Sequence, residues 1–209
     1  MIERSIWLAI YFGVLIWSGI APKDGFTWLL EVFPAMLGLL LLAVTYRRFP
    51  LTRMLYWLLL VHAVILMIGG HYTYAEVPWF DTLREWFDWQ RNNYDKVGHF
   101  AQGFVPAILA REILLRLNVV CGNGWLNFLV ICICLAVSAS YELVEWGVAL
   151  ASGDAAVEFL ATQGDPWDTQ SDMGFALMGA ALALVFLSRW HDWQLARLHA
   201  AQGLKNGKL

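Results

Sequence analysis

Three short polar clusters interrupt a chain that is otherwise rich in apolar segments. They read YDKVGHF at 94–100, SYELVEW at 140–146 and GDPWDTQSD at 164–172. Together they supply an imidazole and several carboxylates, which are the ligand types that bind zinc, manganese or iron. Ionisable side chains inside a bilayer are costly unless they are paired or hydrated, so we treat these residues as functional candidates.

The first cluster places polar groups on one side of an expected helix. Asp95, His99 and Gln102 follow each other at spacings of four and three residues, so they share a face. Asp95 also has a structural interpretation, because an acid is favoured in the first turn of a helix that Asn92 or Asn93 caps. Capping does not account for His99, which lies one turn further in and needs a hydrogen-bond partner or a metal.

The second cluster brings two carboxylates to the end of another apolar segment. Glu142 and Glu145 are three residues apart and share a helical face. Two charged carboxylates at this spacing need cations, a shared proton or water in apolar surroundings. A structural alternative is an interhelical salt bridge with Lys96 or Arg91.

The third cluster combines capping residues with an acid that capping does not explain. Asp165 before Pro166 fits an N-cap followed by proline, and Asp168 fits an acid in the first turn. Asp172 lies one turn further along the same face. The residues that follow on this face are small enough for close contact with another helix, namely Ala176, Gly179 and Ala183.

We expect the three clusters to form one site near the outer membrane surface. Four side chains should lie within about 10 Å of one another, because sites in helical bundles are built from facing helices: His99, Glu142, Glu145 and Asp172. The expected metal ligands are His99, Glu142, Asp168 and Asp172. The expected catalytic residues are Glu145 as general base, Lys96 as the cation that neutralises an anionic head group, and Asp95. Possible accessory residues are His71, Glu76 and Asp165, whereas we expect His62 to be a hydrogen-bonded packing residue.

Three classes of function remain compatible with this site. An enzyme would use a divalent cation, such as zinc, manganese or iron, for hydrolysis or group transfer on an envelope lipid. A carrier would use the same carboxylates to bind a cation or protons. In a non-catalytic membrane scaffold the polar residues would only hold the helices of the bundle together. The absence of an evident sequence repeat slightly favours an enzyme over a carrier.

Composition and apolar segment lengths place this site in a membrane protein. The chain has 209 residues, of which 59% are hydrophobic and 15% charged, and its mean hydropathy is +0.55. Six segments have the length and character of membrane spans: 6–20, 29–46, 55–70, 97–115, 126–149 and 173–190. We therefore predict an all-α polytopic membrane protein, a six-span helical bundle formed by a single domain at 1–191, which contacts membrane lipids and no nucleic acid.

The distribution of lysine and arginine predicts the orientation. Basic residues concentrate in alternate loops and after the sixth segment, so both termini should be cytoplasmic and 192–209 should form a cytoplasmic tail. The three clusters then face the periplasm. Residues 79–91 would place apolar side chains on one face of a helix and charged side chains on the other. This pattern predicts an amphipathic helix that lies on the membrane surface.

The longest motifs closely resemble those of the YjdF family of bacterial inner-membrane proteins. These motifs are GGHYTYAEVP (69–78), YDKVGHFAQGFVPA, SYELVEW and QGDPWDTQSDMG, together with the TYRRFPLT loop. The resemblance covers essentially the whole chain. It implies a multi-pass location in the inner membrane and does not imply a reaction.

A looser likeness to VanZ-like membrane proteins covers about residues 95–180. Asp95, Lys96, His99, Glu142 and Asp172 are similar to the polar positions of that family. The sequence departs from its pattern because Glu145 stands where a glutamine is typical and Ala176 where an asparagine is typical. The likeness implies cell-envelope chemistry.

Overall fold

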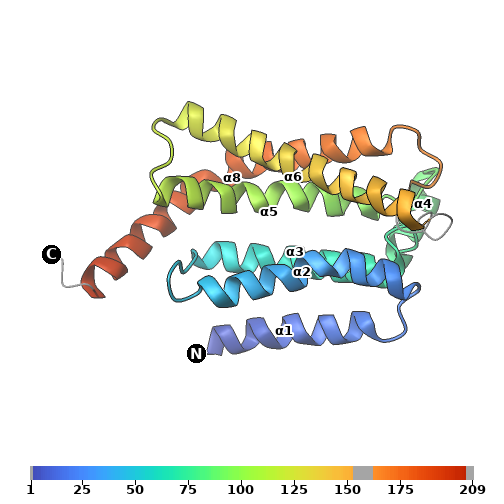
Figure 1. The fold of residues 1–209 in the computed structure, drawn as a ribbon, viewed down its shortest axis with the longest axis horizontal. Coiled ribbons are helices and arrows are strands. Elements are labelled where there is room, and N and C mark those ends of the chain that lie inside the picture. The colour runs from blue at the N-terminus through green and yellow to red at the C-terminus, as the bar shows by residue number, and fades with distance from the viewer. Residues whose placement is uncertain (1, 153–161, 206–209) are drawn as a thin grey trace.

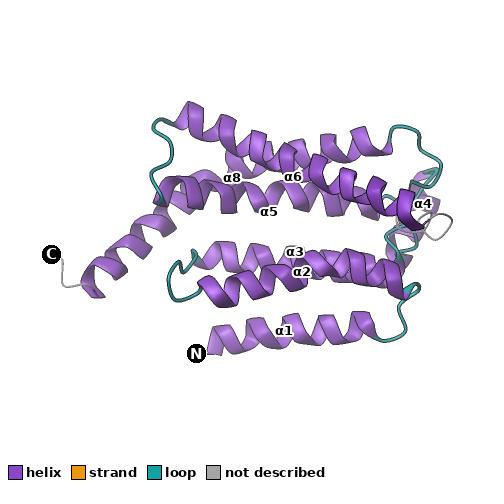
Figure 2. Ribbon diagram, viewed as in Figure 1, coloured by secondary structure: helices purple, strands orange, loops and turns teal. Residues whose placement is uncertain are grey.

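The computed structural model describes residues 2–152 and 162–205, and the elements in these ranges are all helices (Figure 2). The helices are α1 (Ile2–Gly19), α2 (Gly25–Thr45), α3 (Arg53–Tyr72), α4 (Pro78–Phe87), α5 (Tyr94–Arg116), α6 (Asn123–Ser152) and α8 (Asp168–Lys205). Each expected span and the expected surface helix overlaps one of them. The predicted all-α class is therefore confirmed for the described part of the chain.

Length and apolarity support four membrane crossings in the described residues rather than the six predicted. The qualifying helices are α2, α3, residues Asn123–Ala151 of α6 and residues Asp168–Ala200 of α8. The helix α1 carries Glu3 and Arg4 in its first turn, and α5 carries polar groups at both ends. The helix α5 can be this polar because much of its surface is buried by other helices.

The bundle consists of two groups of helices that meet at α3 and α5. The helix α3 packs against α1 and α2, while α5, α6 and α8 pack against one another. Figure 1 shows these six helices running along the long axis, with α4 at one end and both termini toward the other. Because α5 contacts α3, α6 and α8, its polar residues lie inside the bundle.

The closest helix contact joins α5 to α8 through two glycines. A Cβ atom at Gly103 would collide with the carbonyl oxygen of Ala176, and one at Gly179 would collide with the carbonyl oxygen of Phe100. Ala176 is fully buried in this contact. The small residues predicted to allow close approach therefore do so, and they bring together the ends of α5 and α8 that carry Asp95 and Asp172.

A second set of buried polar residues connects the helices at the other end of the bundle. Glu112 accepts hydrogen bonds from the Thr52 backbone N–H and hydroxyl group, from Arg116 and from His191, with the His191 Nε2 3.0 Å away. Glu112 and His191 are both fully buried. Since each group has partners, this network connects the α2–α3 loop, α5 and α8 without leaving an uncompensated charge.

Two helix boundaries differ from those predicted. The helix α4 ends at Phe87, because Asp88 adopts a left-handed conformation with a φ of 53°, so Arg91 lies in a loop instead of a helix. The helix α8 begins at Asp168, before the predicted span at 173–190, and continues through residue 191 into the C-terminal segment as far as Lys205. Its last turns leave the bundle in Figure 1, since its 38 residues span about 57 Å, more than a bilayer core.

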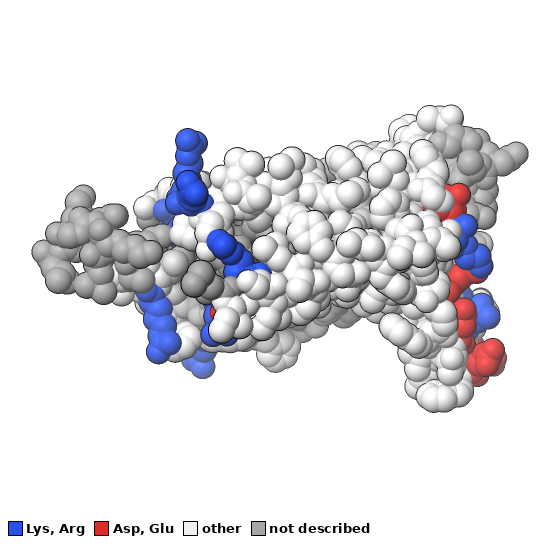
Figure 3. All heavy atoms as spheres, turned by 90° about the horizontal axis from the view of Figure 1, so that it is seen from below, with Lys and Arg blue, Asp and Glu red and all other residues white. Residues whose placement is uncertain are grey.

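Charged residues are distributed unevenly along the bundle. Figure 3 shows lysine and arginine side chains at the end that carries the C-terminus, and a mixture of acidic and basic side chains at the opposite end. The surface between the two ends is almost free of charge in this view. Such an uncharged band is what a membrane-embedded surface requires.

Candidate functional site

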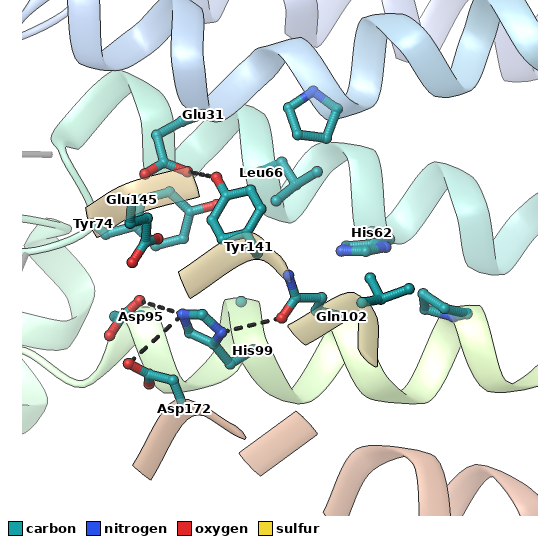
Figure 4. A pocket seen from close by; sticks show the side chains of 14 residues that line it. Glu31, His62, Leu66, Tyr74, Asp95, His99, Gln102, Tyr141, Glu145 and Asp172 are labelled. Atoms are coloured by element: carbon teal, nitrogen blue, oxygen red, sulfur yellow. Dashed lines mark hydrogen bonds and ion pairs between the residues drawn. The ribbon is translucent and has the colours of Figure 1, made fainter. Parts of the chain in front are cut away.

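Three ionisable side chains converge where α5 meets α8. The His99 Nε2 lies 3.3 Å from an Asp95 carboxylate oxygen and 3.8 Å from an Asp172 carboxylate oxygen. One ligand atom from each residue falls within 4.8 Å of the others, and all three residues are buried (Figure 4). One imidazole and two carboxylates at this separation have the chemistry and the spacing to coordinate a divalent cation.

The hydrogen bond to Gln102 orients the His99 ring. The His99 Nδ1 lies 3.2 Å from the Gln102 Oε1, which can only accept a hydrogen bond. With the Nδ1 donating to Gln102, the Nε2 faces Asp95 and Asp172. It donates a hydrogen bond to them when it is protonated, and its lone pair is available to a cation when it is not. Metal-binding histidines are commonly oriented by such a hydrogen bond at the other ring nitrogen.

Cations from α5 and from the loop before it pair with the aspartates. The Lys96 Nζ lies 2.5 Å from Asp168 and 2.7 Å from Asp172, while Arg91 contacts Asp95 at 3.2 Å and also Asp168. Burial opposes the charge of Arg91, but Asp168 and Asp95 raise the pKa of its guanidinium above the ordinary value. Asp168, which we expected to be a metal ligand, therefore belongs to an ion-pair network.

The two glutamates of α6 approach the same place from the other side. A Glu142 oxygen lies 3.8 Å from the His99 Nδ1, and Glu145 lines a cavity with His99 and Asp172. Glu142 is 9% exposed, and its Oε1 is buried without a hydrogen-bond partner in the described residues. The salt bridge that we considered between these glutamates and Lys96 does not form, because Lys96 pairs with the aspartates.

The cavity has a volume of about 160 Å³. Its lining includes residues that the sequence analysis missed. Glu31 on α2 accepts a hydrogen bond of 3.0 Å from the Tyr141 hydroxyl group on α6, and Tyr74 lies beside them (Figure 4). Burial raises the pKa of Tyr74 well above its ordinary value, so its hydroxyl group stays neutral. Glu31 was detectable in the sequence, because it is a lone acid inside an apolar span.

The three possible accessory residues lie in two different parts of the structure. Asp165 lies 3.5 Å from Arg91 and so borders the ion-pair network. His71 instead binds the Ser18 carbonyl oxygen at 3.0 Å, and Glu76 forms an exposed ion pair with Lys23. His71 and Glu76 therefore contact α1 and the loop that follows it.

Carboxylates outnumber cations in this region, which we call the outer cluster. Its acids are Glu31, Asp95, Glu142, Glu145, Asp165, Asp168 and Asp172, and its basic residues are Arg91, Lys96 and His99. Buried negative charge in excess of positive charge requires protons or additional cations. The arrangement therefore has the capacity to accept a divalent cation.

Comparison with known proteins identifies the family. The model of the family described as predicted membrane protein (DUF2238) matches residues 4–193. The chain belongs to this family. It is 53% identical over 190 residues to inner membrane protein YjdF of Escherichia coli (strain K12), with 91% of each chain covered. No solved structure matches the chain, and the comparisons do not show the looser likeness to VanZ-like proteins.

Membership of this family agrees with the helices described above. The relative in Escherichia coli is by its name an inner-membrane protein, and the chain has helices able to cross a membrane. The YjdF resemblance identified in the sequence is thereby confirmed. The chain is a membrane protein whose embedded helices enclose the outer cluster.

Proposed function

We propose that this protein is a six-span enzyme of the inner membrane that binds a divalent cation in a cavity open toward the periplasm. The observation that carries the proposal is the convergence of Asp95, His99 and Asp172, with ligand atoms within 4.8 Å of one another. Hydrogen bonding orients the His99 ring, and burial limits competition from water. Capping alone does not require these three residues to meet.

The proposed orientation rests on charge and on the positions of the termini. Both termini lie at the end of the bundle where basic side chains gather (Figures 1 and 3). Cytoplasmic loops carry an excess of lysine and arginine, so this end is assigned to the cytoplasm. In the six-span arrangement α1 and α5 also cross the membrane, with α5 shielded from lipid by its neighbours.

The proposed chemistry is hydrolysis or group transfer on an envelope lipid. Asp95, His99 and Asp172 would hold the cation. Glu142 lies 3.8 Å from the other ring nitrogen of His99, the Nδ1, and would have to turn its carboxylate toward the Nε2 side to join them. Glu145 is the general base that takes a proton from the attacking water. Lys96 and Arg91 hold the aspartates in position through ion pairs.

Metal binding by purified protein tests the proposal. We expect the wild-type protein, reconstituted in detergent with zinc, manganese or iron and then desalted, to retain one of these metals by elemental analysis. His99→Gln should weaken retention by about tenfold or more, because it removes a ligand. His71→Gln is a matched control at the same end of the bundle and should retain the metal. A wild-type protein that retains none of the three metals would contradict the proposal.

A carrier is the second candidate, and two prolines favour it. Pro34 in α2 and Pro106 in α5 both line the cavity. Proline interrupts the hydrogen bonding of a helix and permits bending at that level. Uptake of manganese or protons into proteoliposomes, without hydrolysis of any added lipid, would favour the carrier over the enzyme.

A further inference from the structure

The polar cavity of the outer cluster adjoins a larger apolar cavity. The second cavity has about 460 Å³ of space and shares Pro34, His62 and Leu66 with the first. Its walls are mainly aliphatic side chains of α2, α3 and α5, such as Leu39, Leu59 and Leu109. Because both cavities meet at the same three residues, one ligand with a polar end and an apolar end can occupy them together.

The apolar cavity is long enough to hold a hydrocarbon chain. Along α2 its lining runs from Pro34 to Thr45, which corresponds to about 16 Å of helix. Gly38 widens the cavity, since a Cβ atom there would meet nothing within 4 Å. An apolar space of this length in a membrane protein fits the acyl chain of a lipid.

The polar end of the ligand should carry a positive charge. Glu31 and Glu145 both line the polar cavity, and neither forms an ion pair within the described residues. The cations Lys96 and Arg91 are occupied by aspartates on the opposite wall, at α5 and α8. A primary ammonium group between Glu31 and Glu145 would supply the missing charge and hydrogen-bond donors. It would engage one Glu145 oxygen and leave the other to act as the proposed general base.

A polar group also lies at the junction of the two cavities. The His62 Nε2 is buried and has no hydrogen-bond partner in the described residues, so the expectation of a hydrogen-bonded packing histidine was wrong. Buried polar groups without partners are uncommon in folded proteins. In a glycerolipid the ester groups lie between the head group and the chains, so one of them would reach His62.

We propose that the site binds one glycerolipid with an ethanolamine head group. Its ammonium group lies between Glu31 and Glu145, an ester group lies at His62, and one acyl chain fills the apolar cavity. This inference rests on the proposed function, because it names the substrate class of the same site. The lipid phosphate then faces the cation that Asp95, His99 and Asp172 hold.

Lipid retention tests the head group. The full-length protein is placed in nanodiscs of equal parts phosphatidylethanolamine, phosphatidylcholine and phosphatidylglycerol, transferred to detergent, and its retained lipid is measured by native mass spectrometry. We expect phosphatidylethanolamine to be enriched about tenfold, as a charged hydrogen bond would produce. The double variant Glu31→Gln, Glu145→Gln should lose this enrichment. Equal retention of phosphatidylglycerol by the wild-type protein would overturn the proposal.

A second pair of variants tests the apolar cavity. Gly38→Leu places a side chain in the space reserved for the acyl chain, so lipid retention should fall by about tenfold, because the acyl chain then buries less of its apolar surface. Gly13→Leu is the matched control, because Gly13 also has open space around it but lines none of these cavities. Unchanged lipid retention by Gly38→Leu, with a melting temperature equal to that of Gly13→Leu, would overturn the proposal.

Parallel measurement of metal separates this inference from the proposed function. The preference for the ethanolamine head group should persist in the presence of a chelator, because Glu31 and Glu145 select the ammonium group without the cation, although total retention can fall when the phosphate loses its contact with the cation. A protein that retains the ethanolamine lipid but no metal would contradict the proposed function alone. A protein that retains metal but shows no lipid preference would contradict this inference alone.

Discussion

Carboxylates of the outer cluster differ in how well they are paired. Asp168 accepts hydrogen bonds from both Lys96 and Arg91, whereas the Glu142 Oε1 is buried without a hydrogen-bond partner in the described residues and has only the His99 Nδ1 nearby, at 3.8 Å. Removing one partner of a buried ion pair leaves an uncompensated charge, but neutralising a buried carboxylate that lacks hydrogen bonds relieves a desolvation cost. The two residues should therefore respond in opposite ways to the same kind of substitution.

We expect Asp168→Asn to lower the free energy of unfolding by about 3 kcal/mol, because Lys96 and Arg91 lose a shared charge. Glu142→Gln should leave the stability unchanged or raise it slightly, while weakening metal retention. Thermal melting in detergent, with and without a chelator, measures both effects. Strong destabilisation by Glu142→Gln that a chelator does not alter would identify this acid as structural and favour the scaffold.

At the scale of helices, the contact between α5 and α8 determines whether the site can form. Asp95 and His99 come from one helix and Asp172 from the other, so their separation depends on how closely the two backbones approach. Gly103 permits that approach, because any side chain there would meet the backbone of Ala176. Packing against lipid supplies little driving force for such a contact, so close backbone packing is what stabilises it.

Gly103→Ala should therefore destabilise the protein by about 1–3 kcal/mol through overpacking. It should also weaken metal retention, although residue 103 is not a ligand, because α8 moves away from His99. Gly174→Ala on α8 is the control: a Cβ atom there meets nothing within 4 Å. The control should be neutral or stabilise by up to about 1 kcal/mol, because alanine favours a helix. Equal melting temperatures for the two variants would refute the role assigned to this contact.

At the scale of the molecule, the six-span proposal makes a prediction about the two sides of the membrane. A reporter that is active only in the cytoplasm should be active when fused after Lys208. The same reporter inserted between α6 and α8, within 153–161, should be inactive. The reason is the concentration of basic residues at the end of the bundle that carries both termini. Activity at both positions would contradict six spans and place the outer cluster on the cytoplasmic side.

Local patterns in the sequence were sufficient to predict the membrane class and much of the polar cluster. Hydropathy located segments that overlap the helices, and helical spacing placed Asp95 and His99 on one face. The clustering of polar residues at the ends of three segments led to Glu142 and Asp172, which both lie 3.8 Å from His99. These features are predictable because they depend on residues within a few turns of one another.

Only the tertiary structure decided which polar groups became partners. Helical spacing predicts that Asp168 and Asp172 share a face. The rotation of α8 relative to α5 places Asp168 against Lys96 and Arg91, and it places Asp172 near His99 as well. Glu31 joins the site because α2 meets α6 at Tyr141, a contact across 110 residues of sequence. Such pairings depend on the distances and rotations between helices, which the backbone packing of distant small residues sets and no local pattern encodes.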